Sequence, residues 1–357
     1  MKTQKIEFLV IDKIKQANDA YTFVLKPTNN LPFPYHSGQF ITLFLDIEGH
    51  GEIQRSYSFS SSPLTDQYPH ITVKKIDGGI VSTHLAQNIQ IGGLLVGSQP
   101  LGKFFDPYSH IEENCTYFMF SAGSRVTPIY SIAQTILEAS QSNIYFIYSN
   151  KNSDSIIFFN ELELLEKKYP NRFFVKHHLS DNSQLNFLDR LESQDIHDYL
   201  TSSSKGPLRV YICGPKKYSD VIINETKSIN IPKEKIHTES YTAIVHENLS
   251  SEFVIHIGDD RPAIPEEVLI KAKIDGELIE IKCSGEDTLL DALLNEGHSP
   301  PFSCMAGGCM ACMAYVKKGE AWQEEINILT EKGVENGQVL TCQAFPTTHE
   351  IEIEYEE

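Results

Sequence analysis

The sequence has no apolar run long enough to cross a membrane as a helix, and it has little positive charge. None of its segments approaches about 18 consecutive apolar residues, the length that a spanning helix needs. The first residues, MKTQKIEFLVIDKIKQ, alternate like a strand, whereas a signal peptide would carry a continuous apolar stretch. The lack of a spanning segment and the lack of a signal-peptide pattern together predict a cytoplasmic protein without membrane insertion.

Basic residues are the scarcer charged class. The 357 residues include 30 Lys and Arg against 48 Asp and Glu, and the formal net charge is −18. Such a chain is repelled by phosphate-rich surfaces, which argues against nucleic acid or an anionic membrane as the main partner. A protein partner with a basic docking surface fits better. The acidic C-terminus, EIEIEYEE, is consistent with a docking surface and equally with a solvated tail or edge strand.

Cysteine is also scarce, and its distribution is uneven. The seven cysteines are an odd number, and four of them crowd near the C-terminus. This pattern does not suit a disulfide framework and favours metal binding in a reducing compartment. Cys304, Cys309, Cys312 and Cys342 follow the order C-x4-C-x2-C with a lone fourth cysteine further on, which is the spacing of a plant-type [2Fe–2S] site.

Four thiolates are what this cluster requires, because two bridged irons each take two terminal sulfurs. The small residues 306–308 between the first two cysteines allow the backbone to close around a cluster. The alternatives are a structural zinc site, which usually shows two short C-x2-C-like pairs, and ordinary buried cysteines. Cys115 and Cys283 lie outside the pattern and are predicted to be core or strand residues.

Three regions with different patterns follow one another along the chain. Up to about residue 107, short apolar segments separated by turn residues predict an antiparallel barrel or sandwich. Between about 113 and 243, apolar strand-like runs alternate with helical stretches, which predicts a doubly wound α/β domain with a parallel sheet. From about 267 onward, two strands around Asp275-Gly276 and a helical stretch over 286–297 predict a small α+β domain.

The predicted domains are 1–110, 111–244 and 267–357, and 41% hydrophobic residues are enough for each to build a core. Residues 245–266 interrupt the α/β rhythm with Asp-Asp-Arg-Pro and a second proline, so they are predicted to be mostly a linker. This linker contains one possible strand, over 252–257.

Residues 268–357 resemble plant-type ferredoxins. The resemblance rests on the predicted strand pair, the helical stretch DTLLDALLNEG, the loop PPFSCMAGGCMACMAYV and the closing VLTCQAFP. It implies a β-grasp fold and a low-potential one-electron carrier. Cys304, Cys309, Cys312 and Cys342 would hold the cluster.

Short motifs in the first domain resemble the flavin-binding domain of the ferredoxin–NADP reductase superfamily. Residues 55–58 match R-x-Y-S and residues 79–82 match G-x-V-S, in the family's order and in a β-rich region. Short motifs also occur by chance, and the alternative is an ordinary barrel strand with a surface arginine and a core tyrosine. The resemblance implies flavin contacts from nine residues: Arg55, Tyr57, Ser58, Thr72, Val73, Lys74, Gly79, Val81 and Ser82.

The residue types suit flavin chemistry. By the resemblance, the Arg55 guanidinium would hold the pyrophosphate, the Tyr57 ring would lie on the isoalloxazine, and the Ser58 hydroxyl would bond near its reactive N5. Backbone N–H groups of residues 79–82, at the start of a helical stretch, would bind the same pyrophosphate. The family usually uses FAD, although these residues alone do not distinguish FAD from FMN.

Residues 120–128, FSAGSRVTP, resemble the nicotinamide-nucleotide loop of the same superfamily, in which a strand passes through a glycine-rich turn into a helix. Proline suits the first helical turn because its missing N–H is not needed there, and the helix start can receive a pyrophosphate. This chain departs from the family where Arg125 replaces a second glycine; Arg125 either donates to the phosphates or obstructs them. The resemblance implies contacts from Gly123, Ser124, Thr127 and Pro128.

Two further strand ends extend this resemblance. Ser149 and Lys151 lie where family members read the adenosine ribose, and they would suit a 2′-phosphate, which slightly favours NADPH over NADH. Cys213, Gly214 and Pro215 lie where the family faces the nicotinamide. For Cys213 alone, a buried strand cysteine is the plain alternative.

The resemblances together imply an electron-transfer protein. Nicotinamide delivers two electrons as a hydride, whereas an iron–sulfur cluster takes one at a time, and a flavin connects the two. No acid–base pair is required, so no catalytic side chain is predicted. The domain order resembles reductase subunits of bacterial oxygenases, most closely those of the phenylacetyl-CoA epoxidase system. It implies NAD(P)H as electron donor and, as acceptor, an oxygenase such as a di-iron enzyme of the epoxidase type.

Other acceptors and one other class of protein stay open. A hydroxylase or a fatty-acyl desaturase would accept the electrons equally well. Alternatively, Arg125 has abolished nicotinamide binding, and the chain is an electron-carrier module that another protein reduces. Bleaching of the purified protein by NADH or NADPH distinguishes these two classes.

Overall fold

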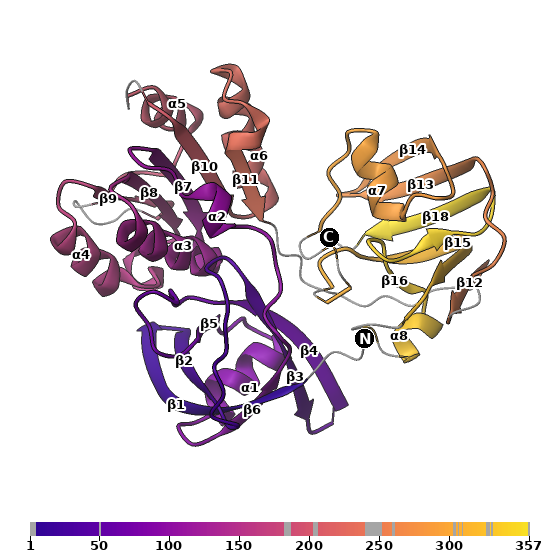
Figure 1. The fold of residues 1–357 in the computed structure, drawn as a ribbon, viewed down its shortest axis with the longest axis horizontal. Coiled ribbons are helices and arrows are strands. Elements are labelled where there is room, and N and C mark those ends of the chain that lie inside the picture. Colours follow the sequence, from indigo (N-terminus) through magenta and orange to yellow (C-terminus); the bar gives the residue numbers. More distant parts are fainter. Residues whose placement is uncertain are drawn as a thin grey trace. The chain divides into compact units, whose positions relative to one another are not determined.

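The computed structural model describes residues 5–49, 51–181, 187–202, 206–239, 252–258, 261–302, 305, 307–308, 310–325, 329 and 331–355. The chain divides into two compact units, Gln4–Glu239 and Ser240–Glu357, here called the N-terminal and C-terminal units. The described residues form three sheets, and their order along the chain confirms the predicted sequence of a β-barrel, a doubly wound α/β fold and an α+β fold (Figure 1). No helix in these ranges has the length and apolarity needed to cross a bilayer.

The first sheet is antiparallel and has the strand order β4-β3-β6-β1-β2-β5. Its strands are β1 (Ile6–Ala17), β2 (Ala20–Pro27), β3 (Phe40–Ile47), β4 (Gly51–Ser58), β5 (His70–Lys74) and β6 (Leu94–Gly97). Alternating apolar residues point inward and form a core that includes Phe8, Phe23 and Leu43. A bridge between Phe59 and Ile71 joins the two ends of the sheet and closes it as a barrel.

Helix α1 (Ile80–Asn88) packs Val81 and Leu85 into the barrel core. The last turn of this helix has no basic residue of its own. Lys13 of β1 takes that role, because its Nζ donates to the carbonyl oxygens of Ala86 and Ile89, both at 2.7 Å. This contact satisfies carbonyls that a helix end leaves open, and it fixes α1 on the barrel.

The second sheet is parallel throughout and has the order β11-β10-β7-β8-β9. Its strands are β7 (Thr116–Ala122), β8 (Asn143–Asn150), β9 (Phe173–Leu179), β10 (Leu208–Cys213) and β11 (Ile236–Glu239). The helices of this region are α2 (Pro107–His110), α3 (Val126–Ala139), α4 (Phe159–Lys168), α5 (Ser193–Ser202) and α6 (Lys216–Ser228), with short 3-10 turns η1 (Gly123–Arg125), η2 (Ser153–Ser155) and η3 (Lys233–Lys235). The strand order reverses between β7 and β10, and α/β proteins bind ligands at the carboxyl edge of such a switch point.

The C-terminal unit contains a mixed sheet of order β12-β15-β18-β13-β14. Its elements are β12 (Glu252–Ile257), β13 (Val268–Ile274), β14 (Glu277–Cys283), α7 (Leu289–Asn295), β15 (Met313–Gln323), α8 (Glu331–Glu335), β16 (Gln338–Leu340), β17 (Phe345–Pro346) and β18 (Glu350–Tyr355). Asp275 and Gly276 connect β13 to β14 with left-handed φ angles of 51° and 80°, as a tight Asp-Gly hairpin requires. Thr288 caps α7 by accepting a hydrogen bond from Asp291 N at 3.0 Å. The predicted hairpin and helix are therefore both present.

Strand β12 comes from the segment that the sequence predicts to be mostly linker. It pairs in parallel with β15 along its whole length and so becomes an edge strand of the C-terminal sheet. Gly258, the residue that follows β12, is also held in place: Trp322 Nε1 donates a hydrogen bond to its carbonyl oxygen at 2.9 Å. The Arg261 guanidinium lies over the rings of Trp322 and Phe345, at 5.3 and 4.1 Å from their centroids. Residues 252–258 and Arg261 are thus held on the C-terminal unit.

The acidic C-terminal segment is an inner strand of this sheet. β18 lies between β15 and β13, so it is neither a solvated tail nor an edge strand. Its glutamates alternate with buried isoleucines, and Glu354 pairs with a lysine of each neighbour. Lys273 Nζ of β13 and Lys317 Nζ of β15 lie 2.6 and 2.7 Å from its carboxylate oxygens. Glu350 and Glu354 are therefore neutralised within the sheet.

Gly38, in the loop before β3, is a position where the fold requires glycine for two reasons. Its φ of 80° is left-handed, and a Cβ there would lie 2.9 Å from Phe105 Cβ and 3.1 Å from Ile132 Cδ1. We expect Gly38→Ala to lower the free energy of unfolding by about 2–4 kcal/mol, from backbone strain and overpacking. Gly49→Ala is the matched control: Gly49 has a φ of 81° but nothing within 4 Å of the added Cβ, so it should cost about 1–2 kcal/mol. Urea unfolding measures both, and equal losses would contradict the close-contact explanation.

Candidate functional site

Two of the four predicted cluster ligands lie side by side in the C-terminal unit. Cys312 directly precedes β15 and Cys342 follows β16, and the pairing of these two strands brings the cysteines together. Their Sγ atoms are 3.2 Å apart, and both side chains are buried. Cys304 and Cys309 lie outside the described residues, so the described part of the chain contains no complete group of three or more metal ligands.

This pair fits two ligands of one metal ion. Two sulfurs that each lie about 2.3 Å from a tetrahedral metal are about 3.8 Å apart, so a small side-chain rotation from the observed 3.2 Å is sufficient. Thr341 holds the backbone of Cys312, because its N and Oγ1 donate to the Cys312 carbonyl at 3.1 and 2.8 Å. Tyr355 Oη in turn donates to Thr341 Oγ1 at 2.9 Å. Buried hydrogen bonds therefore fix the ligand backbone.

The surroundings of the pair also suit an iron–sulfur cluster. Met305, Gly307 and Met310, in the loop before Cys312, all have left-handed backbone, with φ of 53°, 70° and 59°. Backbone that curls in this way can present N–H groups to an anionic ligand. An apolar shell limits access of water to a metal centre. The buried apolar residues around the cysteine pair are Leu290, Met313, Tyr315, Leu329 and Leu340.

Three predicted flavin residues, Arg55, Tyr57 and Ser58, lie together on β4 of the barrel. Arg55 and Tyr57 are two positions apart, so they share one face of the strand, while Ser58 is buried on the other. Burial raises the pKa of Tyr57 above its ordinary value, and the nearby Arg55 guanidinium opposes this shift. A neutral phenol beside a permanent cation suits a flavin, which carries an aromatic ring system and a pyrophosphate.

The predicted flavin residues on β5 are largely committed to the barrel itself. The Thr72 hydroxyl lies 2.7 Å from Thr22 Oγ1 and 2.8 Å from Ser60 Oγ. Val73 belongs to the buried core, and Lys74 Nζ lies 3.7 Å from a carboxylate oxygen in the β1–β2 turn. A cofactor contact of Thr72 or Val73 would therefore involve backbone atoms.

The start of α1 is open to an anion. Gly79 precedes the helix, and no side chain caps the free N–H groups there. Ser82 turns back instead, and its Oγ accepts a hydrogen bond from Ile76 N at 3.1 Å. A Cβ on Gly79 would lie 2.6 Å from that oxygen, so the turn needs glycine. The third predicted residue, Val81, is buried in the barrel core.

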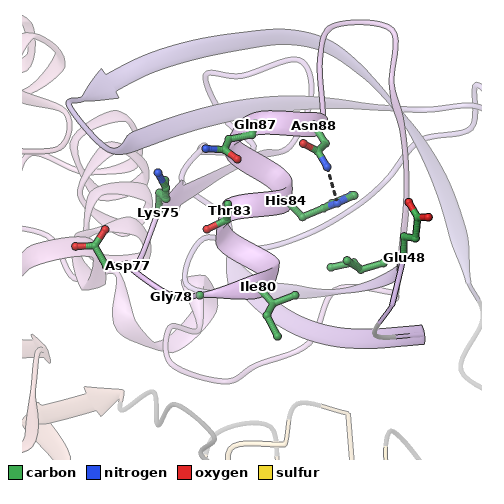
Figure 2. A pocket seen from close by; sticks show the side chains of 11 residues that line it. Glu48, Lys75, Asp77, Gly78, Ile80, Thr83, His84, Gln87 and Asn88 are labelled. Carbon is green, nitrogen blue, oxygen red and sulfur yellow. Dashed lines mark hydrogen bonds between the residues drawn. The ribbon is translucent and has the colours of Figure 1, made fainter.

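A surface pocket of about 550 Å³ extends from this helix start along α1 (Figure 2). Figure 2 shows Asp77 just before the helix start, Thr83, His84 and Gln87 along the helix, and Lys75 to one side of it, level with Thr83 and Gln87. Lys75 and the uncapped N–H groups favour an anion here, whereas the carboxylates of Glu48 and Asp77 in the same lining oppose one. Of the predicted flavin residues, only Gly79 lines this pocket, so the β4 residues lie outside it.

The predicted nucleotide loop joins β7 to α3. Gly123 has a left-handed φ of 57°, and its carbonyl accepts a hydrogen bond from Tyr148 Oη at 2.9 Å. After the turn η1 the chain enters α3, whose start has no side-chain cap. Thr127 and Pro128 are buried in its first turn, and Ser124 is exposed. α3 is 14 residues long, so its peptide dipoles favour an anion at this end.

Cys213 ends β10, across the switch point from this loop. Burial raises the pKa of Cys213 well above its ordinary value, Glu239 raises it further, and Arg125 lowers it. Cys213 is therefore a neutral thiol. Because Arg125 lowers the pKa of Cys213, the charge of Arg125 is felt at the end of β10. Gly214 must be small, because a Cβ there would lie 2.3 Å from a ring carbon of Tyr218. Pro215 follows it at the N-cap position of α6, whose start has no side-chain cap.

Sequence reasoning missed Glu239. Its strand, β11, has only four residues, which is too short to show an alternating pattern. Glu239 is 5% exposed and pairs in register with Cys213. A buried carboxylate at the carboxyl edge of the sheet is a candidate site residue, and only the tertiary structure brings it there.

Asn150, between the two predicted ribose-reading residues, was also missed. It ends β8 and is 8% exposed; its amide lies near the Tyr148 hydroxyl, but among the described residues neither its Oδ1 nor its Nδ2 has a partner with hydrogen-bond geometry. Buried polar groups without partners are costly, and a ribose, whose hydroxyls both donate and accept, would satisfy both amide atoms. Ser149 and Lys151 lie on the other face of the strand, and Lys151 is exposed. The residues present at this edge therefore fit a nucleotide.

His177 of β9 lies next to β8 in aromatic surroundings. Its ring centroid is 5.9 Å from that of Tyr148, 5.6 Å from Phe159 and 5.9 Å from Phe187. Burial lowers the pKa of His177 to about 4, so it is neutral at physiological pH. A neutral aromatic surface suits a planar base.

Family models agree with this arrangement of sites. An oxidoreductase FAD-binding domain model matches residues 7–105, an oxidoreductase NAD-binding domain model matches residues 119–222, and a 2Fe-2S iron-sulfur cluster binding domain model matches residues 272–347. The fold and the sites define an NAD(P)H-dependent oxidoreductase that uses FAD and a [2Fe–2S] cluster. The predicted cofactors and the predicted enzyme class are confirmed.

Curated relatives identify the family more closely. The chain is 30% identical over 323 residues to the 3-ketosteroid-9-alpha-monooxygenase ferredoxin reductase component of Rhodococcus rhodochrous, across 90% of this chain and 88% of the relative. It is 26% identical over 369 residues to one of the subunits of 1,2-phenylacetyl-CoA epoxidase from Escherichia coli, across 98% of this chain and 97% of the relative. The chain belongs to this family of ferredoxin reductase components of oxygenase systems.

Solved structures show the same fold. Phthalate dioxygenase reductase, at 21% identity and a TM-score of 0.57, is matched across 98% of both chains. The FAD/NAD-binding domain of a nitric oxide dioxygenase from Vibrio cholerae, at 23% identity and a TM-score of 0.58, is matched across 66% of this chain and 98% of that chain. The three-domain architecture therefore recurs as a whole in the first of these structures, and its FAD- and NAD-binding part recurs in the second.

We expect Asn150→Ala to weaken nucleotide binding about tenfold, since hydrogen bonds to a bound ribose contribute about 1–1.5 kcal/mol. The stability of the nucleotide-free protein should be unchanged or higher, because the variant removes buried polar groups that lack partners. Asn143→Ala, at the exposed start of the same strand, is the matched control and should alter neither property. Calorimetric titration with oxidised nucleotide and thermal unfolding measure the two effects. Lower stability with unchanged affinity would show that Asn150 has a structural role only.

Proposed function

We propose that this protein passes electrons from NAD(P)H, through FAD and its [2Fe–2S] cluster, to the oxygenase component of a multicomponent oxygenase. The names of its relatives support this acceptor class. They describe reductase components for 3-ketosteroid 9α-monooxygenase and for glycine betaine monooxygenase, and a subunit of phenylacetyl-CoA epoxidase. Because those substrates differ, what the relatives share is the delivery of electrons. An epoxidase-type di-iron enzyme, as the sequence predicts, is one acceptor of this class.

The observation that carries the proposal is the presence of three complementary sites in one chain. The β7–β10 switch point of the parallel sheet has the uncapped start of α3 and the unpaired amide of Asn150. The barrel has Arg55 and Tyr57 on one face of β4. The C-terminal unit has the buried pair of Cys312 and Cys342. A protein that only bound a nucleotide, or only carried one electron, would not need all three.

The residues of the chain bind and orient, and they transfer no proton. When bound, the nicotinamide supplies a hydride, the flavin accepts it and releases single electrons, and the cluster carries one electron at a time. We assign the nucleotide phosphates to the start of α3 and the adenosine ribose to Asn150. Arg55 and Tyr57 hold the flavin, and Cys213, kept neutral by burial, adds no charge beside the nicotinamide. Cys304, Cys309, Cys312 and Cys342 hold the cluster.

Anaerobic mixing of the purified holoprotein with NADH and with NADPH tests this function. We expect one or both to bleach the flavin absorbance and then the cluster absorbance, and we expect the reduced protein to pass electrons to a purified oxygenase component. A protein that contains FAD and cluster but is bleached by neither nucleotide would overturn the proposal. It would favour a carrier module in which Arg125 has closed the nucleotide site.

The cluster site is tested by Cys312→Ser. We expect metal affinity to fall by more than about 100-fold, because a ligand is lost directly. Flavin bleaching by NAD(P)H should continue, since the flavin residues lie in the other compact unit. Cys283→Ser is the matched control: Cys283 lies in the same unit but outside the cluster pattern, and this variant should keep its iron and sulfide. Iron and sulfide analysis measures the outcome, and full retention of both in Cys312→Ser would remove Cys312 from the site.

A further inference from the structure

Buried hydroxyl groups join helix α3 to the barrel within the N-terminal unit. Thr135 of α3 is 4% exposed, and its Oγ1 lies 2.6 Å from Ser37 Oγ and 2.7 Å from Ser62 Oγ. Ser37 comes from the loop before β3, and Ser62 follows β4. Three side chains from three separate segments therefore meet in one hydrogen-bonded group, here called the hydroxyl cluster.

Two further hydrogen bonds extend this contact to the residues before Ser62. Ser131 Oγ donates to the carbonyl of Ser61 at 2.5 Å, and Gln134 Nε2 donates to the carbonyl of Ser60 at 3.3 Å. Three consecutive barrel residues are thus bonded to one helix. Residues 131, 134 and 135 are spaced so that they share one helix face, and this spacing makes the contact continuous.

Both ends of this connection lead to a cofactor residue. On α3, the same face continues one turn back to Thr127 and Pro128, beside the nucleotide loop. On the barrel, residues 60–62 begin two positions after Ser58, the last residue of the strand that carries Tyr57. Figure 1 shows α3 where the parallel sheet meets the barrel, and the turn η1 also contacts β5.

We propose that Thr135 and Ser131 are positioning residues that set the distance between the bound nicotinamide and the flavin. This inference rests on the proposed function, because it needs both cofactors in the sites assigned to them. Hydride transfer requires the reacting atoms to come within about 3–3.5 Å, and an error of about 1 Å can cost about 100-fold in rate. Hydrogen bonds of Ser131 and Thr135 thereby fix the position of α3, and of any nucleotide group bound at its start, relative to the segment that follows β4.

Hydrogen bonds suit this task better than an apolar contact does. An apolar helix face tolerates small sliding movements, since hydrophobic contact is non-directional. Hydrogen bonds prefer narrow ranges of distance and angle, so several bonds along one face define a single register. These hydrogen bonds join the helix that follows the nucleotide loop to the segment that follows β4. Bonds that served stability alone could lie anywhere between the helix and the barrel.

Thr135→Val removes one hydroxyl and keeps the shape of the side chain. We expect the limiting rate of flavin reduction at saturating NAD(P)H to fall by about tenfold or more. The dissociation constant of the oxidised nucleotide and the flavin content after gel filtration should change by less than about twofold, because the groups that bind each cofactor are intact. Thr135→Ser, which keeps the hydroxyl, should restore most of the rate.

Thr226→Val is the matched control. Thr226 is a fully buried helical threonine whose Oγ1 donates to Ile223 O at 2.7 Å, but it lies in α6 and away from the hydroxyl cluster. It should lose thermal stability to a similar extent and keep the wild-type limiting rate. A readout without turnover is the long-wavelength absorbance of nucleotide stacked against flavin, recorded while dithionite-reduced protein is titrated with oxidised nucleotide. Thr135→Val should weaken or shift this absorbance.

The outcomes separate the inference from the function on which it rests. If the wild-type protein is not reduced by either nucleotide, the proposed function fails. If the wild type is reduced and folded Thr135→Val shows the wild-type limiting rate and absorbance, the positioning role is wrong. A rate loss that appears equally in Thr226→Val, or that Thr135→Ser does not reverse, would assign Thr135 a purely structural role.

Discussion

Hydride transfer works only over a very short distance, and this constraint determines how the N-terminal unit must be built. The donor and acceptor atoms must come within about 3–3.5 Å, so two binding sites have to be held in fixed register. The barrel and the parallel sheet belong to one compact unit, and buried hydroxyls join them through α3. Transfer of single electrons does not require the reacting atoms to touch. The cysteine pair accordingly lies in a unit of its own.

Burial controls charge at the carboxyl edge of the parallel sheet. The Cys213 thiol and the His177 imidazole are both neutral at physiological pH because desolvation disfavours their charged forms. Arg125 and Glu239 add opposite charges on the β10 side, and their effects on Cys213 oppose each other. The edge therefore combines uncharged side chains with an uncapped helix start.

Periodic patterns predicted the three sheets and the main helices well. The Asp275-Gly276 hairpin, the helix after Thr288 and the alternation of strand and helix all depend on neighbours in sequence, which a pattern can show. Elements defined by distant partners were harder to predict. β12 lies in a segment rich in turn signals, so the sequence indicated it only as a possible strand over 252–257, and it pairs with β15. The acidic strand β18 lies inside the sheet, where lysines of β13 and β15 pair with Glu350 and Glu354.

The sequence by itself determined which cofactors this protein uses, because metal ligation and flavin binding demand particular residue types at short, local spacings such as C-x4-C-x2-C. Only the tertiary structure decided how the side chains near those motifs are placed. It turned Thr72 and Val73 into the barrel, buried Asn150 and Glu239 at the ends of their strands, and joined α3 to the barrel through the hydroxyl cluster. These roles depend on burial and on pairing between segments far apart in the chain, and neither is encoded in a local motif.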